Sequence, residues 1–432
     1  MFLELSVRIK KQGETARRSI INYSSALRED ARKRLAEIQK VDFLVGIPCY
    51  HNQTTIERVL EVVGDGLKKH FPRLKSLVVV SDGGSTDDSR ELAGSTQLPG
   101  GIEKLVTIYR GLPGKGSSLR AVLEISEILA PSAVIVVDAD LKSISPDWVK
   151  LLAEPILERS YDFVTPFYSR HKFDGTITKL VAYPLTRSVF RKRVHQPIGG
   201  EFGFSGELAK YYTQQDVWDT DVAKFGIDIW LTVTAIEQGF KICQARLGTK
   251  IHNRKDPLSL GKMFREVTGT IFALMEMYQD EWHSLDNSEK VDYFGEWTNE
   301  KAEPVHVSIN DLIDNMCTGF EHFCPLWQQV LSKETSSRLR EVCPSSRETF
   351  SFPADLWAKV VYDFAVSYKN WRKDKQKLVG LMTPLYYGRV AAFCLEVQDM
   401  DTAEAEAVAE KQAAIFEDLK PYLVERAEED CR

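Results

Sequence analysis

Short apolar runs alternate with segments of helical periodicity along residues 41–140. The runs that we interpret as strands are 43–47, 77–80, 105–109 and 133–137. The segments between them repeat apolar residues at helical spacing, over 54–67, 87–93 and 117–129. Strands that alternate with helices are typical of β-α-β units, and near-continuous apolar strands are typical of a sheet covered on both faces. We therefore predict an α/β fold with a mainly parallel central sheet.

The pattern is less regular after residue 140 and becomes largely helical after residue 258. Between these points we predict strands over 163–167 and 240–247, and helices over 177–190 (interrupted near Pro184) and 226–238. Residues 14–40 read as a charged helix with a thin apolar stripe. Such a helix packs on the main domain, or on a second subunit in a homodimer, or remains solvated. The chain thus divides into 1–40, 41–258 and 259–432.

The composition of the chain argues against several classes of protein. With 432 residues and 43% hydrophobic residues, the chain is long enough for two or three domains and a sizeable core. Its net charge of −6 argues against a general affinity for nucleic acid. Seven dispersed cysteines without a Cys-x-x-Cys pair fit a reducing compartment and give no zinc cluster. We see no signal peptide and no apolar run of about 18 residues, so we expect a cytoplasmic protein without an integral membrane segment.

Two carboxylates follow the fourth apolar run, in Val137-Asp138-Ala139-Asp140. In a strand, residues i and i+2 point to the same side, so Asp138 and Asp140 are expected to lie together. Two buried acids need a cation, and Mg²⁺ or Mn²⁺ prefers oxygen ligands that it often shares with substrate phosphates. The motif therefore suggests a metal-diphosphate site. A plain Asp turn that closes a strand is about equally consistent with these residues alone.

Other polar clusters follow the other strands, where ligands bind in open parallel sheets. They are Cys49-Tyr50-His51-Asn52, Ser81-Asp82-Gly83-Gly84, and the loop from Arg110 to Gly116. Gly114-Lys115-Gly116 has neither P-loop nor dinucleotide spacing, and suggests one cation beside a helix N-terminus that favours anions. Asp82 would accept hydrogen bonds from a nucleobase or ribose; the alternative is a turn in which Asp87 or Thr86 caps the next helix.

Two candidates lie further along the chain. His252, just beyond the strand at 240–247, would complete a metal site begun by carboxylates, although a lone histidine is more often structural or exposed. Arg170 follows the strand at 163–167, and its guanidinium suits a small carboxylate or phosphate. A solvated helix face explains most of the other cations nearby.

Taken in order, these motifs resemble the successive nucleotide-binding segments of a GT-A fold nucleotide-sugar glycosyltransferase. Three further stretches are similar to the retaining glucosyl-3-phosphoglycerate and mannosylglycerate synthases: Gln196 to Glu201, Phe225-Gly226-Ile227-Asp228 and His252-Asn253-Arg254. The resemblance covers about residues 42–280. It departs from the family at Phe225, where some relatives carry Trp, and at Gly199-Gly200-Glu201, where the phosphoglycerate-using branch tends to read Ser-Gly-Glu.

The resemblance implies a role for each matching residue. The donor, a uridine or guanosine diphosphate sugar, would be bound by Pro48, Tyr50, Asn52, Asp82, Gly114, Lys115, Asp138, Ala139 and Asp140. Asp140 and His252 would ligate Mg²⁺ or Mn²⁺. The acceptor would be held by Arg170, Thr178, Gly200, Glu201 and Arg254. The residues implied in catalysis are Lys115, Glu201 and Asp228.

The activity that the resemblance implies is transfer of a hexose, with glucose favoured over mannose as the alternative, to glycerate or 3-phosphoglycerate, giving a small anionic glycoside of the compatible-solute type. In this interpretation 1–40 is a helical extension, 41–258 the catalytic domain with a nucleotide half (41–140) and an acceptor half (141–258), and 259–432 a helical region. Two alternatives remain: a sugar nucleotidyltransferase and a non-catalytic sugar-nucleotide-binding protein. The first usually places its glycine-rich loop directly after the first strand, where this chain has Pro48-Cys49-Tyr50-His51.

Overall fold

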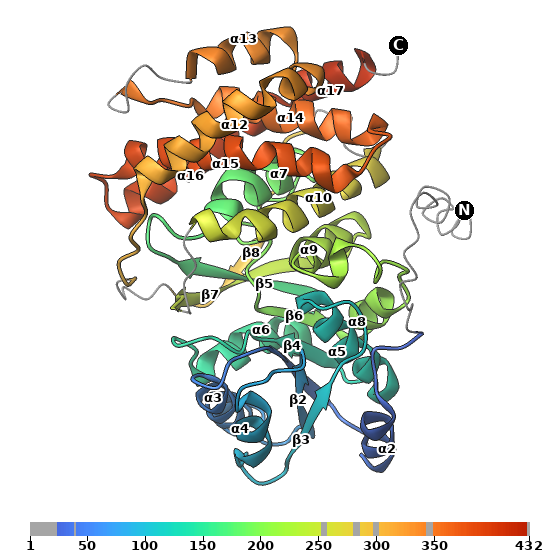
Figure 1. Ribbon diagram of the computed structural model, residues 1–432. Helices are drawn as coiled ribbons and strands as arrows, with labels where there is room; N and C mark the ends of the chain where they lie inside the picture. Colours follow the sequence, from blue (N-terminus) through green and yellow to red (C-terminus); the bar gives the residue numbers. More distant parts are fainter. Residues whose placement is uncertain are drawn as a thin grey trace.

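Figure 1 shows the computed structural model of the chain. It describes residues 24–38, 40–251, 257–279, 286–296, 302–342 and 349–429. Of the helix predicted over 14–40, the described part contains α2, Glu29–Glu37, which contacts β3 through an ion pair between Arg34 and Glu103.

The described residues form one eight-stranded sheet in the order β3-β2-β1-β4-β6-β5-β7-β8. Its strands are β1 (Phe43–Cys49), β2 (Ser76–Asp82), β3 (Ile102–Ile108), β4 (Ala133–Val136), β5 (Phe163–Ser169), β6 (Phe202–Ser205), β7 (Ile242–Thr249) and β8 (Asp292–Phe294). Only β6 is antiparallel to its neighbours, β4 and β5. The predicted α/β class and mainly parallel sheet are confirmed.

Alternate residues of the strands build two separate cores, one on each face of the sheet. Leu77 and Val79 of β2 belong to one core, and Val78 and Val80 to the other, because successive side chains of a strand point to opposite faces. Helices α3 (Ile56–His70) and α6 (Pro146–Arg159) cover one face, while α5 (Lys115–Leu129) and α8 (Gly206–Thr213) cover the other. With helices on both faces, the carboxyl ends of the strands form the edge open to ligands.

The predicted helix over 177–190 is found with a different geometry. Residues Thr178–Ala182 form a π-helical turn, and α7 (Tyr183–Ser188) continues from it. Pro184 lies at the start of α7 and has no N–H to donate, so the turn before it widens: the amide of Tyr183 donates to the carbonyl of Thr178. The interruption was therefore predicted at the right place, but it is a wider turn rather than a break.

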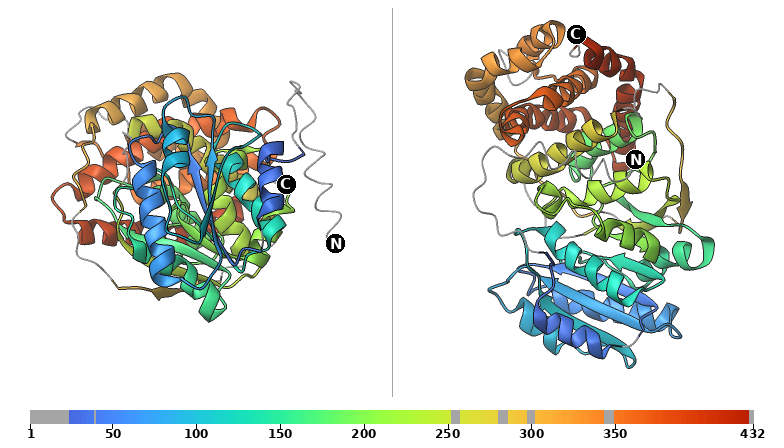
Figure 2. Two further views of the ribbon diagram at one scale, coloured as in Figure 1. Left: turned by 90° about the horizontal axis from the view of Figure 1, so that it is seen from below. Right: turned by 90° about the vertical axis from the view of Figure 1, so that its right-hand side faces the viewer.

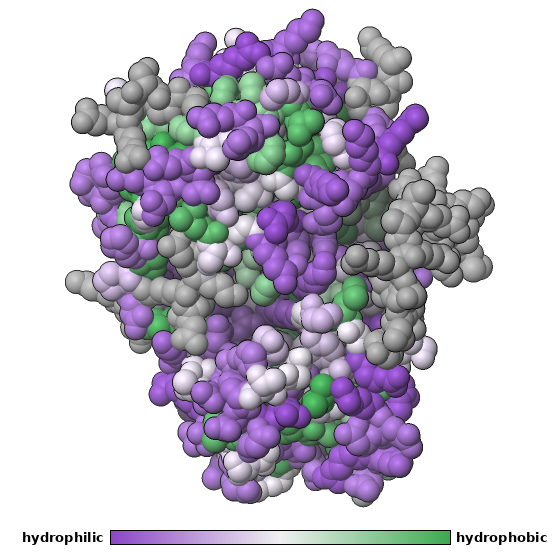
Figure 3. Space-filling model, viewed as in Figure 1, coloured by the Kyte–Doolittle hydropathy of each residue, from purple (hydrophilic) through white to green (hydrophobic). Residues whose placement is uncertain are grey.

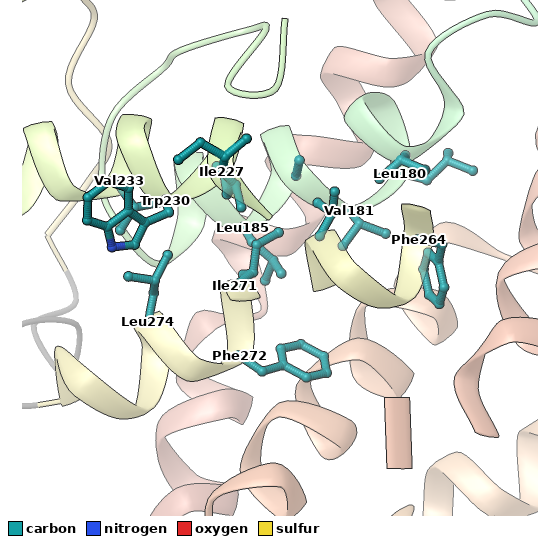
Figure 4. Close-up of a cluster of buried hydrophobic side chains, with 14 of the residues drawn as sticks. Leu180, Val181, Leu185, Ile227, Trp230, Val233, Phe264, Ile271, Phe272 and Leu274 are labelled. Atoms are coloured by element: carbon teal, nitrogen blue, oxygen red, sulfur yellow. The ribbon is translucent and has the colours of Figure 1, made fainter. Parts of the chain in front are cut away.

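A layer of C-terminal helices lies at the end of the molecule opposite β1–β3 (Figures 1 and 2). Its members are α12 (Ile309–Val330), α13 (Lys333–Val342), α14 (Ala354–Asn370), α15 (Lys375–Val397), α16 (Thr402–Asp418) and α17 (Lys420–Glu429). Below it lie α9 (Ile227–Glu237) and α10 (Gly261–Met277). Figure 4 shows how Ile227 of α9 and Ile271 of α10 pack with Val181 of the π-helical turn and Leu185 of α7 in one buried cluster.

The described part of the region after residue 258 is largely helical, as predicted. The exception is β8, which pairs with β7 at the edge of the sheet. Within the described residues, α15 is long and apolar enough to cross a membrane by length and composition alone. Most of α15 is buried against other helices of the protein, so this is weak evidence for a membrane span.

Candidate active site

Five charged side chains meet at the carboxyl edge of the sheet. Each stands at the end of an element: Lys115 begins α5, Asp138 follows β4, Glu201 precedes β6, Asp228 lies in the first turn of α9, and Lys250 follows β7. Figure 3 shows that the surface is hollowed between the part of the molecule that contains β1–β3, below, and the C-terminal helices above. The topology thus gathers residues that are far apart in the sequence, as the rule for parallel sheets predicts.

Lys115 forms the centre of this cluster. Its Nζ lies 2.8 Å from Asp138 Oδ1 and 3.1 Å from Asp228 Oδ2. Lys250 Nζ donates to both carboxylate oxygens of Glu201, at 2.8 and 2.9 Å, and to the carbonyl of Gly199 at 2.8 Å. It also lies 3.6 Å from Asp138 Oδ2, which joins the two halves of the cluster. The arrangement is one network of three carboxylates and two ammonium groups.

Burial decides how these groups are charged. It acts against the charge on Lys115, but the carboxylates of Asp138 and Asp228 outweigh it and raise the lysine pKa. Burial likewise opposes the charge on Asp138, yet Lys115 and Lys250 hold its pKa well below the usual range. For Glu201, which is fully buried, burial dominates and raises the pKa to about 8. Burial also raises the pKa of Asp228, although Lys115 opposes this shift.

Glu201 gives the protein a stability that depends on pH. Its pKa rises on folding from the ordinary 4.5 to about 8, so the folded protein retains a proton that the unfolded chain releases. The stabilisation by protonated Glu201 is complete below about pH 4.5. As the pH then rises to about 8, the free energy of unfolding falls by up to about 1.4 kcal/mol per pH unit. We expect Glu201→Gln, which stays neutral, to flatten the unfolding free energy between about pH 5 and pH 8 in chemical denaturation. An equal fall in the free energy of unfolding in wild type and variant would contradict this prediction. Glu61→Gln, a change of an exposed glutamate, is the matched control.

The turn before Glu201 brings the backbone against the cluster. Gly200 has φ of +97°, and a Cβ built there would lie 2.4 Å from Asp138 Oδ2. Only glycine adopts this conformation readily and leaves room for the carboxylate. The predicted Gly200 is thus in the site because its lack of a side chain admits Asp138.

The acidic pair differs from the prediction in its geometry. Strand β4 ends at Val136, so Asp138 and Asp140 lie in the turn beyond it, and the alternation of a strand does not apply to them. Asp138 is paired with two lysines, Lys115 at 2.8 Å and Lys250 at 3.6 Å. Asp140 is half-buried in the same turn, and the carbonyl of Ala139 between them accepts from Thr55 at 2.7 Å.

The glycine loop is fixed by close packing. A Cβ on Gly116 would lie 1.8 Å from the carbonyl of Val222, and one on Gly114 would lie 2.6 Å from that of Ala223. The amide of Gly114 donates to Tyr109 Oη at 2.9 Å. These contacts hold the first turn of α5, and with it Lys115, against the segment that leads to Asp228.

The predicted nucleotide side lies at the ends of β1 and β2. Tyr50 is 60% exposed and stacks on His51, with 4.1 Å between the ring centroids. Asp82 is buried and accepts from the amides of Gly84 and Ser85 at 2.7 and 2.8 Å, so its carboxylate closes the turn after β2.

Two more of the predicted donor residues are placed here. Asn52 Oδ1 accepts from the amide of Tyr50 at 2.8 Å, and Pro48 is half-buried within β1. This edge of the sheet therefore carries the exposed ring of Tyr50, beside turns that Asn52 and Asp82 hold through hydrogen bonds to backbone amides.

Arg170 and Thr178, the predicted acceptor residues, are both buried. Arg170 lies over the ring of Tyr168 at 5.1 Å and is 3.6 Å from Asp174. Its Nε has no hydrogen-bond partner in the described part of the chain. Lys250 lies over the same ring at 5.1 Å, so Tyr168 connects Arg170 with the charged cluster.

The structure describes one of the two predicted metal ligands. Asp140 is described, whereas His252 and Arg254 lie outside the described residues. Within the residues that the structure describes, no group of three His, Cys, Asp or Glu side chains forms a metal site by itself. The residues present fit a metal held by one carboxylate and shared with substrate phosphates, which is the usual manner of Mg²⁺ binding.

Lys250 is the residue that sequence reasoning missed. It follows the predicted strand over 240–247, at the same edge as the other candidates. A cation directly after a strand of this sheet is a candidate ligand-binding residue, and Arg170 was predicted on this basis. Lys250 has the same position, but His252, two residues later, was predicted instead.

Comparison with known proteins adds to this geometry. Residues 91–263 match the family described as mannosylglycerate synthase, GT domain. Glucosyl-3-phosphoglycerate synthase of Petrotoga mobilis is 25% identical over 265 residues, which are 57% of this chain and 77% of that protein.

Solved structures of glucosyl-3-phosphoglycerate synthase from Mycobacterium tuberculosis are also similar. The complex with Mn²⁺, UDP and glucosyl-3-phosphoglycerate is 25% identical, has a TM-score of 0.42, and the match covers 56% of this chain and 81% of that one. The complex with Mg²⁺ and UDP is 24% identical with a TM-score of 0.42, covering 58% and 85%. The sequence matches name glycosyl transfer rather than nucleotidyl transfer. Residues 91–263 thus match a glycosyltransferase domain, and the matches support a hexosyltransferase of the glucosyl-3-phosphoglycerate synthase and mannosylglycerate synthase type.

Proposed function

We propose that this enzyme transfers glucose from a nucleoside diphosphate sugar to glycerate or 3-phosphoglycerate, with retention of configuration and with a divalent metal. The observation that carries the proposal is Lys115 bridging Asp138 and Asp228 at the carboxyl edge of the sheet, inside the matched domain. A fixed ammonium group between two carboxylates suits a site that receives a diphosphate on one side and sugar hydroxyls on the other.

The nucleoside would lie on the edge formed by β1 and β2. The exposed ring of Tyr50 offers a stacking surface for a base, next to the frame of Asp82 and Asn52. The names of the similar Mycobacterium tuberculosis complexes include UDP and UDP-glucose, which agrees with a uridine donor carrying glucose.

Asp140 would hold Mg²⁺ or Mn²⁺ together with His252 and the donor diphosphate. When bound, the metal would neutralise charge on the diphosphate. The similar solved complexes contain Mn²⁺ or Mg²⁺ with UDP. Asp138, already paired with two lysines, would instead face the ribose or the hexose.

Lys115 would act on the leaving group. As the bond from the anomeric carbon to the diphosphate breaks, negative charge grows on the diphosphate oxygen, and positive charge grows on the sugar. An ammonium group already oriented by Asp138 and Asp228 stabilises this charge without reorganising. Because the charge is greater in the transition state than in the ground state, the contact accelerates the reaction.

Retention favours entry of the acceptor on the face that the diphosphate leaves, with a diphosphate oxygen taking the acceptor proton. Glu201 is a poor nucleophile here, because it is fully buried and both its oxygens accept from Lys250. Asp228 has Oδ2 held by Lys115, while its buried Oδ1 has no partner in the described part of the chain. That oxygen would accept a hydroxyl of the hexose and fix the sugar for attack.

Arg170 and Thr178 would hold the acceptor's carboxylate. The Nε of Arg170 is buried without a partner, and a carboxylate would satisfy it. We place the reaction in the cytoplasm, where the thiols of the described cysteines, Cys49, Cys243, Cys317, Cys324 and Cys394, stay reduced.

A matrix of donors and acceptors tests the proposal. UDP-glucose, GDP-glucose and GDP-mannose are each incubated with glycerate and with 3-phosphoglycerate in Mg²⁺ or Mn²⁺, and products are read by NMR. We expect an α-linked glucoside from an α-linked donor, with release of nucleoside diphosphate. A β-linked product would reject retention, and release of pyrophosphate would favour a nucleotidyltransferase.

A further inference from the structure

A short turn over residues 220–225 joins the two ends of the charged cluster. On one side, the carbonyl of Lys224 accepts from the amide of Gly116 at 3.1 Å, and Gly116 directly follows Lys115. On the other side, the turn leads into α9, whose first turn carries Asp228. The position of the 220–225 turn therefore helps to set where Lys115 and Asp228 lie relative to each other.

Glu266 of α10 holds the end of this turn. It is 4% exposed, and its Oε2 accepts from the amide of Phe225 at 3.3 Å. The nearby ammonium group of Lys262 is 3.9 Å from Glu266 Oε1, and its side chain is 70% exposed, so this ion pair contributes little. A buried carboxyl group is costly to keep, and this one fixes a backbone amide three residues before Asp228.

Gln376 of α15 holds the start of the turn. Its Nε2 donates to Asp221 Oδ2, and the other carboxylate oxygen of Asp221 accepts from Lys224 at 2.9 Å. The side chain of Gln376 passes α10 at Gly269, where a Cβ would lie 3.1 Å from its Nε2. The 220–225 turn is thus attached at both ends to helices that follow residue 258.

Close packing makes this attachment rigid. A Cβ on Gly226 would lie 2.1 Å from Thr270 Oγ1 of α10. One turn further, Ile271 of α10 and Ile227 of α9 belong to the same buried cluster (Figure 4). Because protein interiors are densely packed, a displacement of α10 would be transmitted to the turn and to the start of α9.

We propose that Glu266 and Gln376 are positioning residues, through which α10 and α15 hold Lys115 and Asp228 in the geometry that hexosyl transfer requires. Both act through the 220–225 turn, which is what their side chains contact. A misplacement of about 1 Å can lower a rate about 100-fold, so loss of either contact should lower kcat. The effect on rate rests on the proposed function, whereas the attachment of the glycine loop to α10 does not.

Kinetics of single variants give the first test. Glu266→Leu removes the acceptor for the Phe225 amide and should lower kcat at least about tenfold, while Glu266→Gln, whose amide oxygen still accepts, should stay within about twofold of wild type. Gln376→Leu should lower kcat about fivefold, because Asp221 keeps its contact with Lys224. Wild-type kcat in folded Glu266→Leu and Gln376→Leu enzymes, or equal losses in Glu266→Leu and Glu266→Gln, would overturn the inference.

Glu276→Leu is the matched control on the same helix. Glu276 of α10 pairs with Lys375 of α15 at 2.6 Å, so this variant loses a contact between the two helices but none to the 220–225 turn. We expect its kcat to remain that of wild type. A loss as large as that of Glu266→Leu would show that any weakening of the helical layer lowers the rate, which would also overturn the inference.

A double-mutant cycle separates positioning from a loss of folded enzyme. In the Lys115→Met background, Glu266→Leu should lower kcat by less than about threefold further, because the group that it positions is already absent. A fall in folded enzyme would instead multiply with the effect of Lys115→Met. Losses that multiply in full would therefore overturn the inference.

Hydrogen exchange measured by mass spectrometry tests the attachment without turnover. The amide of Gly116 lies in the first turn of α5, where a helix offers it no partner, and it depends on the carbonyl of Lys224. Glu266→Leu should accelerate exchange about tenfold in peptides that cover 114–118 and 220–226, and leave peptides of β2 unchanged. Unchanged exchange at 114–118, or equal acceleration in β2, would overturn the inference. Local acceleration in a protein that transfers a hexose to no acceptor would reject the proposed function and leave the attachment standing.

Discussion

Lys115→Met is expected to lower kcat for hexosyl transfer at least about 100-fold, the scale seen when an oriented group that stabilises developing charge is removed. The substitution takes away the cation that pairs with Asp138 at 2.8 Å and Asp228 at 3.1 Å. Negative charge on the departing diphosphate would then meet Asp228 without its cation, and Asp138 paired only with Lys250 at 3.6 Å. Initial rates with UDP-glucose and glycerate, together with thermal unfolding, measure the effect.

A loss of folding must be separated from a loss of chemistry. Breaking a buried ion pair from one side costs about 3–5 kcal/mol, so Lys115→Met is also expected to be less stable. Lys115→Arg keeps the charge and should fold, but its planar fork cannot reproduce the position of a single ammonium group. We expect this variant to retain donor binding and to lose most of its kcat. Lys150→Met, a change of a half-exposed lysine on α6, should leave the rate unchanged. A folded Lys115→Met enzyme with normal turnover would exclude the role given to Lys115.

Asp140→Asn is expected to reduce transfer at least about 100-fold and to weaken Mn²⁺ binding in the presence of UDP, because an amide is a poorer ligand than a carboxylate for a hard cation. Asp140 is the described member of the predicted ligand pair, so the effect should exceed that of other carboxylates near the cleft. Titration of Mn²⁺ by electron paramagnetic resonance measures binding separately from activity.

Asp147→Asn provides the matched control for this prediction. Asp147 is an exposed carboxylate on α6 that pairs with Lys69 at 2.9 Å, and its loss should change neither metal binding nor rate. Near-normal rates of Asp140→Asn with added Mg²⁺ or Mn²⁺ would show that the metal is held elsewhere.

Much of the sheet can be predicted from the sequence, because buried parallel strands are continuous apolar runs. All four runs in residues 41–140 became strands, each within a few residues of its predicted position. Strands β6 and β8 were missed, since Phe202-Gly203-Phe204-Ser205 and Asp292-Tyr293-Phe294 are too short to show a period.

The members of the charged cluster could be predicted singly, but not their pairing. Lys115, Asp138, Glu201 and Asp228 were each assigned to the site from motifs. The pairing of Lys115 with Asp138 depends on a contact between the start of α5 and the end of β4, which spacing does not reveal. The contacts of Glu266 and Gln376 with the 220–225 turn were beyond prediction for the same reason, because each joins residues far apart in the chain.

A crystal structure of the protein with UDP-glucose and Mn²⁺ tests the central claim most directly. It should show the diphosphate between Lys115 and a metal bound to Asp140, with a hexose hydroxyl within hydrogen-bond distance of Asp228 Oδ1. A donor bound at another edge of the sheet, or a diphosphate out of reach of Lys115, would contradict the account.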